Sequence, residues 1–235
     1  AHPDCLLRTM STFAGFFIKQ IEDDLSWREA ELAILRKEVI SSTPGTPKHI
    51  TFLRTNLAMI YAHYEGFCKF AISVYIDALE KRNTKRIDLK WKLASASLFE
   101  LVCSLKDEKE TADFLKRFLN EFDSALEQSA TFPRPDNIAN LWPDLLISWL
   151  DRLDLSHNNV SENSTQLDSL VSNRNHIAHG KKLTISTLPQ LDEYAHAAKI
   201  AMHEVAIGIA DALEKQLYLR KSRAMTILGH ATDKE

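Results

Sequence analysis

Residues 48–82 form the stretch that most limits how this chain can fold. Apolar and aromatic side chains recur there in alternating steps of four and three, and no proline interrupts the run. The positions are Leu57, Tyr61, Tyr64, Cys68, Ala71, Tyr75 and Ala78. This spacing predicts one long helix that buries a single seam between neighbouring helices of a bundle. Gly66 lies within the run, where we expect it to allow a close helix crossing.

The rest of the chain is predicted to form further helices joined by turn-rich segments. Apolar spacing predicts helices over residues 11–41, 88–105, 107–127, 138–153, 165–179 and 187–221. Asp23-Asp24 marks a candidate break in the first, and a short extended piece is expected at 183–185. Loops are predicted at 41–47, 128–137 and 156–164. Candidate capping pairs are Thr165 with Asp168 and Thr187 with Gln190.

These elements predict an all-α fold in one helical-bundle domain over residues 1–235, with its core at about 10–221. Long antiparallel helices and short accessory helices are expected. The chain has only six glycines and seven prolines, which favours long helices over a turn-rich β fold. Its 45% hydrophobic and 26% charged residues match a soluble globular protein.

Neither the apolar runs nor the cysteines indicate a membrane or secreted protein. No run approaches the length of a membrane span, and the start lacks a secretory signal. The first residue is not Met, which leaves processing or trimming open. The cysteines are Cys5, Cys68 and Cys103, an odd number without a C-x-x-C pair. This predicts a cytoplasmic protein without a disulfide framework or zinc ribbon.

The net charge of −3 excludes a globally basic nucleic-acid binder, but positive charge gathers in three places. Residues 81–92 carry six Lys or Arg side chains against one acid, residues 215–223 carry four cations without an acid, and Lys181-Lys182 form a pair. Each patch has two interpretations. It attracts RNA phosphates, or it is a solvated helix end.

The run Ser172-Asn173-Arg174-Asn175-His176-Ile177-Ala178-His179-Gly180 combines groups suited to phosphate chemistry at a predicted helix end. The guanidinium of Arg174 can bind a phosphate through several donors. His179 can take or give a proton near neutral pH. The alternative is an ordinary helix end, where cations are favourable and Gly180 caps the last turn.

A resemblance to a known family sharpens this interpretation. The Arg174-Asn175-x-x-x-His179 pattern resembles the signature of the HEPN superfamily (higher eukaryotes and prokaryotes nucleotide-binding). Residues 53–70 resemble the long helix of its MAE-like branch, which is prokaryotic and associated with toxins or defence. Trp27-Arg28 and Glu31-Leu32 precede that helix in the expected order, and the resemblance covers residues 10 to 220.

The resemblance implies a homodimeric endoribonuclease that acts in the cytoplasm without a metal or another cofactor. The ribose 2′-OH would attack the adjacent phosphate, with Arg174, Asn175 and His179 as catalytic residues. In this scheme Arg174 holds the scissile phosphate, His179 transfers the proton, and Asn175 orients His179 or donates to the phosphate. Lys181 and Lys182 would bind substrate. The expected partners are RNA, a second copy, and a cognate antitoxin or a protein of an antiviral defence complex.

Two accessory residues and several alternatives stay open at this point. Glu65 pairs with Arg174 in a structural ion pair or lines the cleft, and His176 has no certain role. A metal at His176 and His179 is a minor alternative, because no H-E-x-x-H pattern or nearby Cys completes it. In several toxins of the superfamily a Tyr lies two residues after the motif His and is modified by a partner enzyme. Lys181 occupies that position here, so this control is not expected.

The placement of Arg174 and His179 on the helix, and the function of the chain, each leave an alternative open. At about 100° per residue, Asn175 and His179 share a helix face, whereas Arg174 and His179 lie about 140° apart. A site shared between two copies would bring the two residue types together more easily than one chain could. The alternative function is a non-catalytic HEPN-like subunit, used for dimerisation or protein binding in a defence complex.

Overall fold

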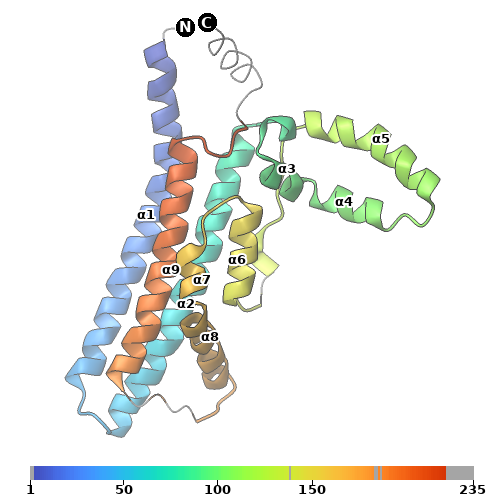
Figure 1. Ribbon diagram of the computed structural model, residues 1–235. Coiled ribbons are helices and arrows are strands. Elements are labelled where there is room, and N and C mark those ends of the chain that lie inside the picture. The colour runs from blue at the N-terminus through green and yellow to red at the C-terminus, as the bar shows by residue number, and fades with distance from the viewer. Residues whose placement is uncertain (1–2, 138, 183–184, 186, 221–235) are drawn as a thin grey trace, which may run out of the picture.

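The computed structural model describes residues 3–137, 139–182, 185 and 187–220 (Figure 1). Its regular elements within these ranges are helices, with two isolated β-bridges. The α-helices are α1 (Pro3–Ser41), α2 (Pro47–Lys81), α3 (Trp91–Ser97), α4 (Phe99–Lys106), α5 (Thr111–Glu127), α6 (Pro143–Arg152), α7 (Asn158–Glu162), α8 (Ser164–Ala178) and α9 (Leu188–Glu214). Two 3-10 turns are η1 (Arg86–Asp88) and η2 (Pro135–Asn137). The prediction of an all-α fold is confirmed.

Three long helices, α1, α2 and α9, pack along one another and form the main bundle (Figure 1). α1 runs antiparallel to the other two, whereas α2 and α9 run in the same direction. The chain between them passes through α3 to α8 and returns to the end where α2 began. The shorter α6, α7 and α8 lie along the side of this bundle, and α8 contacts both α2 and α9.

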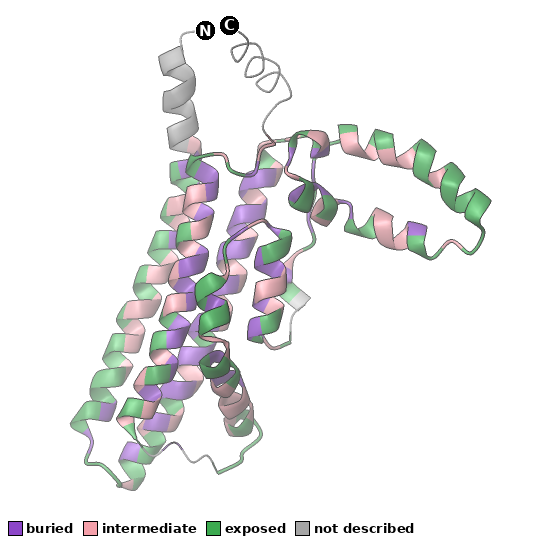
Figure 2. Cartoon of the chain, viewed as in Figure 1, coloured by how far each residue is buried: buried purple, intermediate pink, exposed green. Residues whose placement is uncertain are grey.

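The predicted seam of α2 is the centre of the hydrophobic core. Tyr61, Tyr64, Cys68 and Tyr75 are all buried, as are Leu57 and Ala71 on the same seam. Burial raises the pKa of the Cys68 thiol and of the Tyr64 hydroxyl well above their ordinary values, because both charged forms would lose hydration. The seam is therefore structural. Figure 2 shows this buried layer along the facing sides of the three long helices.

The absence of a side chain at Gly66 leaves room for the Arg28 side chain of α1. A Cβ atom at this position would lie 2.8 Å from Nη1 of Arg28 on α1. The Arg28 guanidinium is held there by Asp24, whose Oδ2 lies 2.6 Å from Arg28 Nε. The expected close approach thus exists, but it is made by an arginine side chain.

The first helix continues through the candidate break at Asp23-Asp24. Asp24 accepts hydrogen bonds from the Trp27 ring nitrogen at 3.0 Å and from Arg28 one turn later. These bonds lie three and four residues along the helix, where side chains share a face and stabilise it. The acidic pair therefore supports α1 at this point.

Several predicted boundaries differ from the structure. The predicted helix 88–105 is divided at Leu98 into α3 and α4. The short helix α7 lies within the predicted loop 156–164, and α9 ends at Glu214, before the predicted 221. Residues 183 and 184 of the expected extended piece lie outside the described ranges.

Neither predicted capping pair forms its side-chain bonds. Asn163 is the N-cap of α8, which places Thr165 inside the first turn. Thr187 is the N-cap of α9 but makes no capping bond through its side chain. Gln190 donates instead to the Tyr194 hydroxyl at 3.4 Å. The N-cap of α9 was therefore predicted correctly and that of α8 two residues too late, while neither predicted capping bond forms.

Candidate functional site

The motif stretch forms the last turn of α8 and the turn that ends it. Gly180 adopts a φ of +70°, the left-handed conformation predicted for a C′ cap. Its N–H donates to the Ile177 carbonyl at 3.0 Å, and the Lys181 N–H donates to the His176 carbonyl at 2.9 Å. This pair of bonds is the Schellman motif, which closes the helix and fixes His179 as its final capping residue.

Arg174 is held against the bundle by three contacts. Nη1 donates to the side-chain oxygen of Asn140 at 3.2 Å and to that of Asn175 at 3.0 Å. The guanidinium carbon lies 4.6 Å from the centre of the Tyr61 ring, in a cation–π contact. Asn175 thus contacts Arg174 in this structure. These contacts hold the guanidinium in place before any ligand arrives.

Tyr61 links α2 to the segment that precedes α6. Its hydroxyl accepts a hydrogen bond from the backbone N–H of Leu141 at 3.2 Å and lies 3.5 Å from Asn140 Oδ1. Burial, together with the nearby Glu65 carboxylate, raises the pKa of Tyr61 to about 12. The hydroxyl is therefore neutral at physiological pH and acts as a hydrogen-bonding support for the Arg174 pocket.

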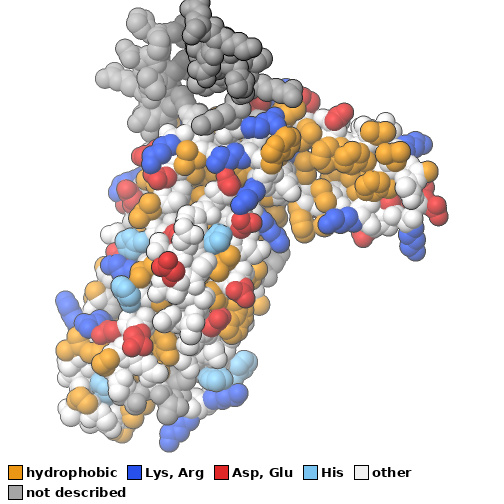
Figure 3. Space-filling model, in the orientation of Figure 1, with side chains coloured by type: hydrophobic (Ala, Val, Ile, Leu, Met, Phe, Trp, Pro, Cys, Tyr) orange, Lys and Arg blue, Asp and Glu red, His pale blue; other side chains and the backbone are white. Residues whose placement is uncertain are grey.

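The exposed groups of the site lie at the end of α8. His176, His179, Lys181 and Lys182 are all exposed to solvent. Arg54 on α2 donates through Nη1 to the Lys181 carbonyl at 3.1 Å, which ties the segment after the motif to the long helix. In Figure 3, Lys, Arg and His side chains gather at this end of the molecule. An anionic ligand would meet positive charge there.

Glu65 does not form the expected ion pair with Arg174. Its Oε1 lies 2.7 Å from the ammonium nitrogen of Lys69, one turn along α2. Within the described ranges, Arg174 takes part in no ion pair. The Arg174 guanidinium contacts neutral oxygens and an aromatic ring. These groups do not cancel its positive charge, so the charge remains available to an anion.

Sequence reasoning missed Asn140 and Arg54. Asn140 lies between η2 and α6, where no periodic spacing marks it, and it meets Arg174 only through the fold. Arg54 was noted as part of the α2 segment, but its contact with Lys181 spans 127 residues of sequence. Tyr61 was predicted as a core residue, and its role in holding Arg174 emerges only from the structure.

Arg174 and His179 have different surroundings within one chain. The Arg174 guanidinium faces α2 and the Asn140 segment, whereas His179 is exposed at the helix end. Across the described residues, no three His, Cys, Asp or Glu side chains group closely enough to hold a metal ion. One copy therefore presents a guanidinium held by neutral groups and, separately, an exposed imidazole.

The basic patch at residues 81–92 is largely committed to other contacts. Lys85 pairs with Glu127 at 3.0 Å, Lys90 with Asp154 at 2.7 Å, and Lys92 with Asp151 at 2.7 Å. Lys81 and Arg82 lie over phenylalanine rings of α1. This patch has little free positive charge for RNA, in contrast to the end of α8.

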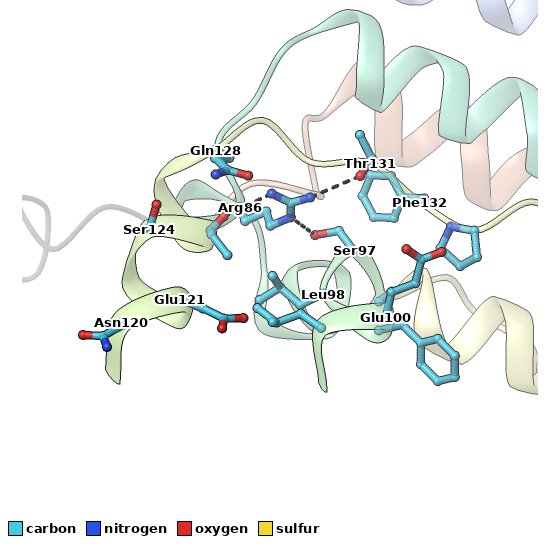
Figure 4. A pocket seen from close by; sticks show the side chains of 15 residues that line it. Arg86, Ser97, Leu98, Glu100, Asn120, Glu121, Ser124, Gln128, Thr131 and Phe132 are labelled. Carbon is cyan, nitrogen blue, oxygen red and sulfur yellow. Dashed lines mark hydrogen bonds between the residues drawn. The ribbon is translucent and has the colours of Figure 1, made fainter. Parts of the chain in front are cut away.

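A pocket of about 650 Å³ lies between α5 and the α3–α4 segment, away from the motif (Figure 4). Arg86 is buried against it and donates to Ser97 Oγ at 2.9 Å and to the Ala125 carbonyl and Thr131 Oγ1 at 3.1 Å each. Burial lowers the pKa of Arg86. The described residues that line the pocket do not include Arg174 or His179. These bonds make Arg86 a structural link between η1, α3, α5 and the segment after α5.

Comparison with known proteins decides the family. The family model described as "HEPN_MAE_28990:/-like HEPN" matches residues 17–218, which is most of the chain. The chain belongs to this HEPN family. The match includes α2, the Asn140 segment and the whole of α8, so the HEPN motif and its supporting contacts lie inside it. No curated protein and no solved structure matches the chain significantly.

Membership supports the functional reading of the motif at a coarse level. HEPN proteins are associated with nucleotide binding and often with ribonuclease activity, and the polar site at the end of α8 fits such chemistry. Among the described helices, none is long and apolar enough to span a membrane.

Proposed function

We propose that this HEPN protein is an endoribonuclease that acts as a homodimer and needs no metal ion. The observation that carries the proposal is the pairing of a preorganised Arg174 with an exposed His179 at a capped helix end. A fixed guanidinium costs little reorganisation when charge develops on a phosphate. An exposed imidazole is accessible for proton transfer.

In the proposed reaction the ribose 2′-oxygen forms a bond to the adjacent phosphorus, and the bond from phosphorus to the 5′-oxygen breaks. His179 takes the proton from the 2′-OH, and the departing 5′-oxygen takes up a proton from solvent water. The products are a 2′,3′-cyclic phosphate and a 5′-OH end. Arg174 holds the phosphate and the charge that builds on it, while Asn175 stabilises the orientation of Arg174.

The proposed cleft lies between two copies. About 140° of helical angle separates Arg174 from His179, so we propose that a second copy related by a two-fold axis brings His179 of one chain toward Arg174 of the other. Lys181, Lys182 and Arg54 from both copies would then border the same groove and attract RNA. His176, exposed one turn before Gly180, would stand at its rim. We further propose a cytoplasmic toxin or defence effector controlled by an antitoxin or a complex partner.

A second candidate is a non-catalytic HEPN subunit that serves in dimerisation or protein binding. It is favoured by the contacts that Arg174 makes within the chain, which would also suit a purely structural arginine. Glu65, tied to Lys69, would then have a structural role as well. The two candidates differ in whether the motif groups react.

Expression in a bacterial host separates the candidates. Wild type should arrest growth, whereas His179→Ala should not, because it lacks the proposed proton-transfer group. His179 is exposed, so its loss should leave the core intact. Equal soluble amounts of the two proteins serve as the control. Equal toxicity, or toxicity of neither, would favour the non-catalytic subunit.

A further inference from the structure

The arm formed by α4 and α5 presents an uncovered apolar surface. The two helices project from the bundle (Figure 1), and α5 contains no buried residue. Leu115 is 53% exposed and Leu119 is 62% exposed, with Phe114 and Phe118 beside them. Figure 3 shows hydrophobic side chains gathered along this arm. Monomeric surfaces seldom leave so dense an apolar patch in water, and such patches mark contact sites.

The apolar side chains of α5 follow the pattern of a two-helix seam. Their steps are four, three and four residues, through the positions Leu115, Leu119, Phe122 and Leu126. In heptad terms these are alternating d and a positions. Asn120, Glu121 and Ser124 line the pocket against α3 and α4, and Figure 4 shows them on that side. At about 100° per residue the seam lies roughly on the opposite side of α5, so it faces outward.

Two charged side chains beside the α5 seam indicate which partner can cover the seam. Lys116 and Asp123 are one heptad apart, on the same edge of the seam, and both are exposed. Neither forms an ion pair with any described residue. A second α5 lying antiparallel would place each Lys116 against the partner's Asp123, twice about a two-fold axis near residues 119–120. In a parallel pair each e position would instead lie beside a g position of the partner, so Lys116 and Asp123 would face Thr111 and Phe118 and meet no opposite charge.

We propose that α5 pairs antiparallel with α5 of a second copy of this chain, through the seam and the two Lys116–Asp123 pairs. The interface lies far from the end of α8, because the arm and the motif occupy opposite ends of the molecule (Figure 1). It is therefore separate from the proposed RNA cleft. Combined with two-fold pairing at α8, it joins chains into an assembly larger than a dimer, which closes at four copies if the two axes cross at right angles.

Charge reversal tests the pairing. Lys116→Glu and Asp123→Lys should each weaken association at least tenfold, since each places two like-charge contacts in the interface. The double variant restores opposite charges and should recover the mass of wild type, measured by sedimentation velocity over a dilution series. Double and single variants of equal mass would overturn the proposal.

Two further variants serve as controls for this test. Leu119→Glu places charge in the seam and should halve the mass, whereas Asp113→Lys lies on the other side of α5 and should leave it unchanged. Circular dichroism must show equal helix content in all variants. If wild type sediments as a monomer at tens of micromolar, or Leu119→Glu does not change the mass, α5 does not pair copies. RNA cleavage measured alongside reports separately on the α8 site, so either proposal can fail alone.

Discussion

The guanidinium of Arg174 lies 4.6 Å above the ring of Tyr61, which is itself fixed in the core of the bundle. Through this contact the best-buried helix of the protein sets the position of a residue at its candidate reactive site. The Tyr61 hydroxyl extends the link to Leu141 and Asn140, which also binds Arg174. Fold stability and placement of the proposed phosphate-binding group are therefore coupled.

Removing the Tyr61 hydroxyl should weaken the fold and loosen Arg174. Tyr61→Phe keeps the ring but leaves the buried N–H of Leu141 without its partner, at a cost of about 1–3 kcal/mol. Tyr75→Phe is the matched control, because the buried Tyr75 hydroxyl has no hydrogen-bond partner among the described residues and its loss should cost little. Urea unfolding of both variants tests the difference. Equal losses would show that the Leu141 bond contributes nothing.

The seam of α2 should tolerate little loss of volume. Leu57 is fully buried, so Leu57→Ala should lower the free energy of unfolding by about 2–5 kcal/mol. Ile207 on α9 is 61% exposed, and Ile207→Ala should change stability by no more than about 0.5 kcal/mol. Chemical unfolding measures both. A Leu57→Ala protein as stable as wild type would mean that the seam faces solvent.

His63 should make stability fall in acid. Burial lowers the pKa of His63, although the Glu31 carboxylate opposes this shift, and Arg28 and Asp24 also face the ring. The unfolded chain binds a proton near pH 6.5 while folded His63 does not, so its contribution is present above that pH and lost as pH falls. The loss is at most about 1.4 kcal/mol per pH unit.

The comparison for His63 is His63→Gln, which cannot titrate. Unfolding free energies between pH 7 and pH 5 should fall less steeply for this variant than for wild type. Parallel curves would show that His63 takes up its proton equally in both states. Other titrating groups act in both proteins, and the difference between the curves isolates His63.

Lys181 and Lys182 should matter for RNA and not for folding. Both side chains are exposed, so Lys181→Glu with Lys182→Glu should change stability by less than about 1 kcal/mol. RNA binding, measured by fluorescence anisotropy, should weaken strongly, and its dependence on salt should become shallower. The same reversals at Lys85 and Lys92, which are tied to acids, form the control. Equal effects at both places would contradict the assigned groove.

The sequence was most informative where local spacing decides the structure. The seam of α2, the all-α class and the Gly180 cap follow from periodicity and backbone preference, and all three are confirmed. The contact of Asn140 with Arg174 spans 34 residues and depends on how the segment before α6 returns to the bundle. Glu65 was a candidate ion-pair partner of Arg174 but pairs with Lys69, because a partner one helical turn away is reached at little entropic cost.

Asp24 and Leu98 show the same limit at element boundaries. Acidic neighbours suggested a break in α1, yet Asp24 finds donors three and four residues on and stabilises the helix. The apolar run at 88–105 is divided at Leu98, where the chain changes direction into the arm. The Asp24 bonds are local and depend on which side chains follow it, whereas the division at Leu98 depends on tertiary packing. The single-domain organisation stays a prediction.

Mixing two inactive variants tests the shared site most directly. Arg174→Ala and His179→Ala should each abolish RNA cleavage while remaining folded. If Arg174 of one copy acts with His179 of the other, the mixed dimer holds one complete site. An equal mixture, after subunit exchange, should then recover about a quarter of wild-type cleavage, in excess EDTA and with 2′,3′-cyclic phosphate ends. A mixture as inactive as either parent, with mixed dimers shown to form, would contradict a site shared between copies.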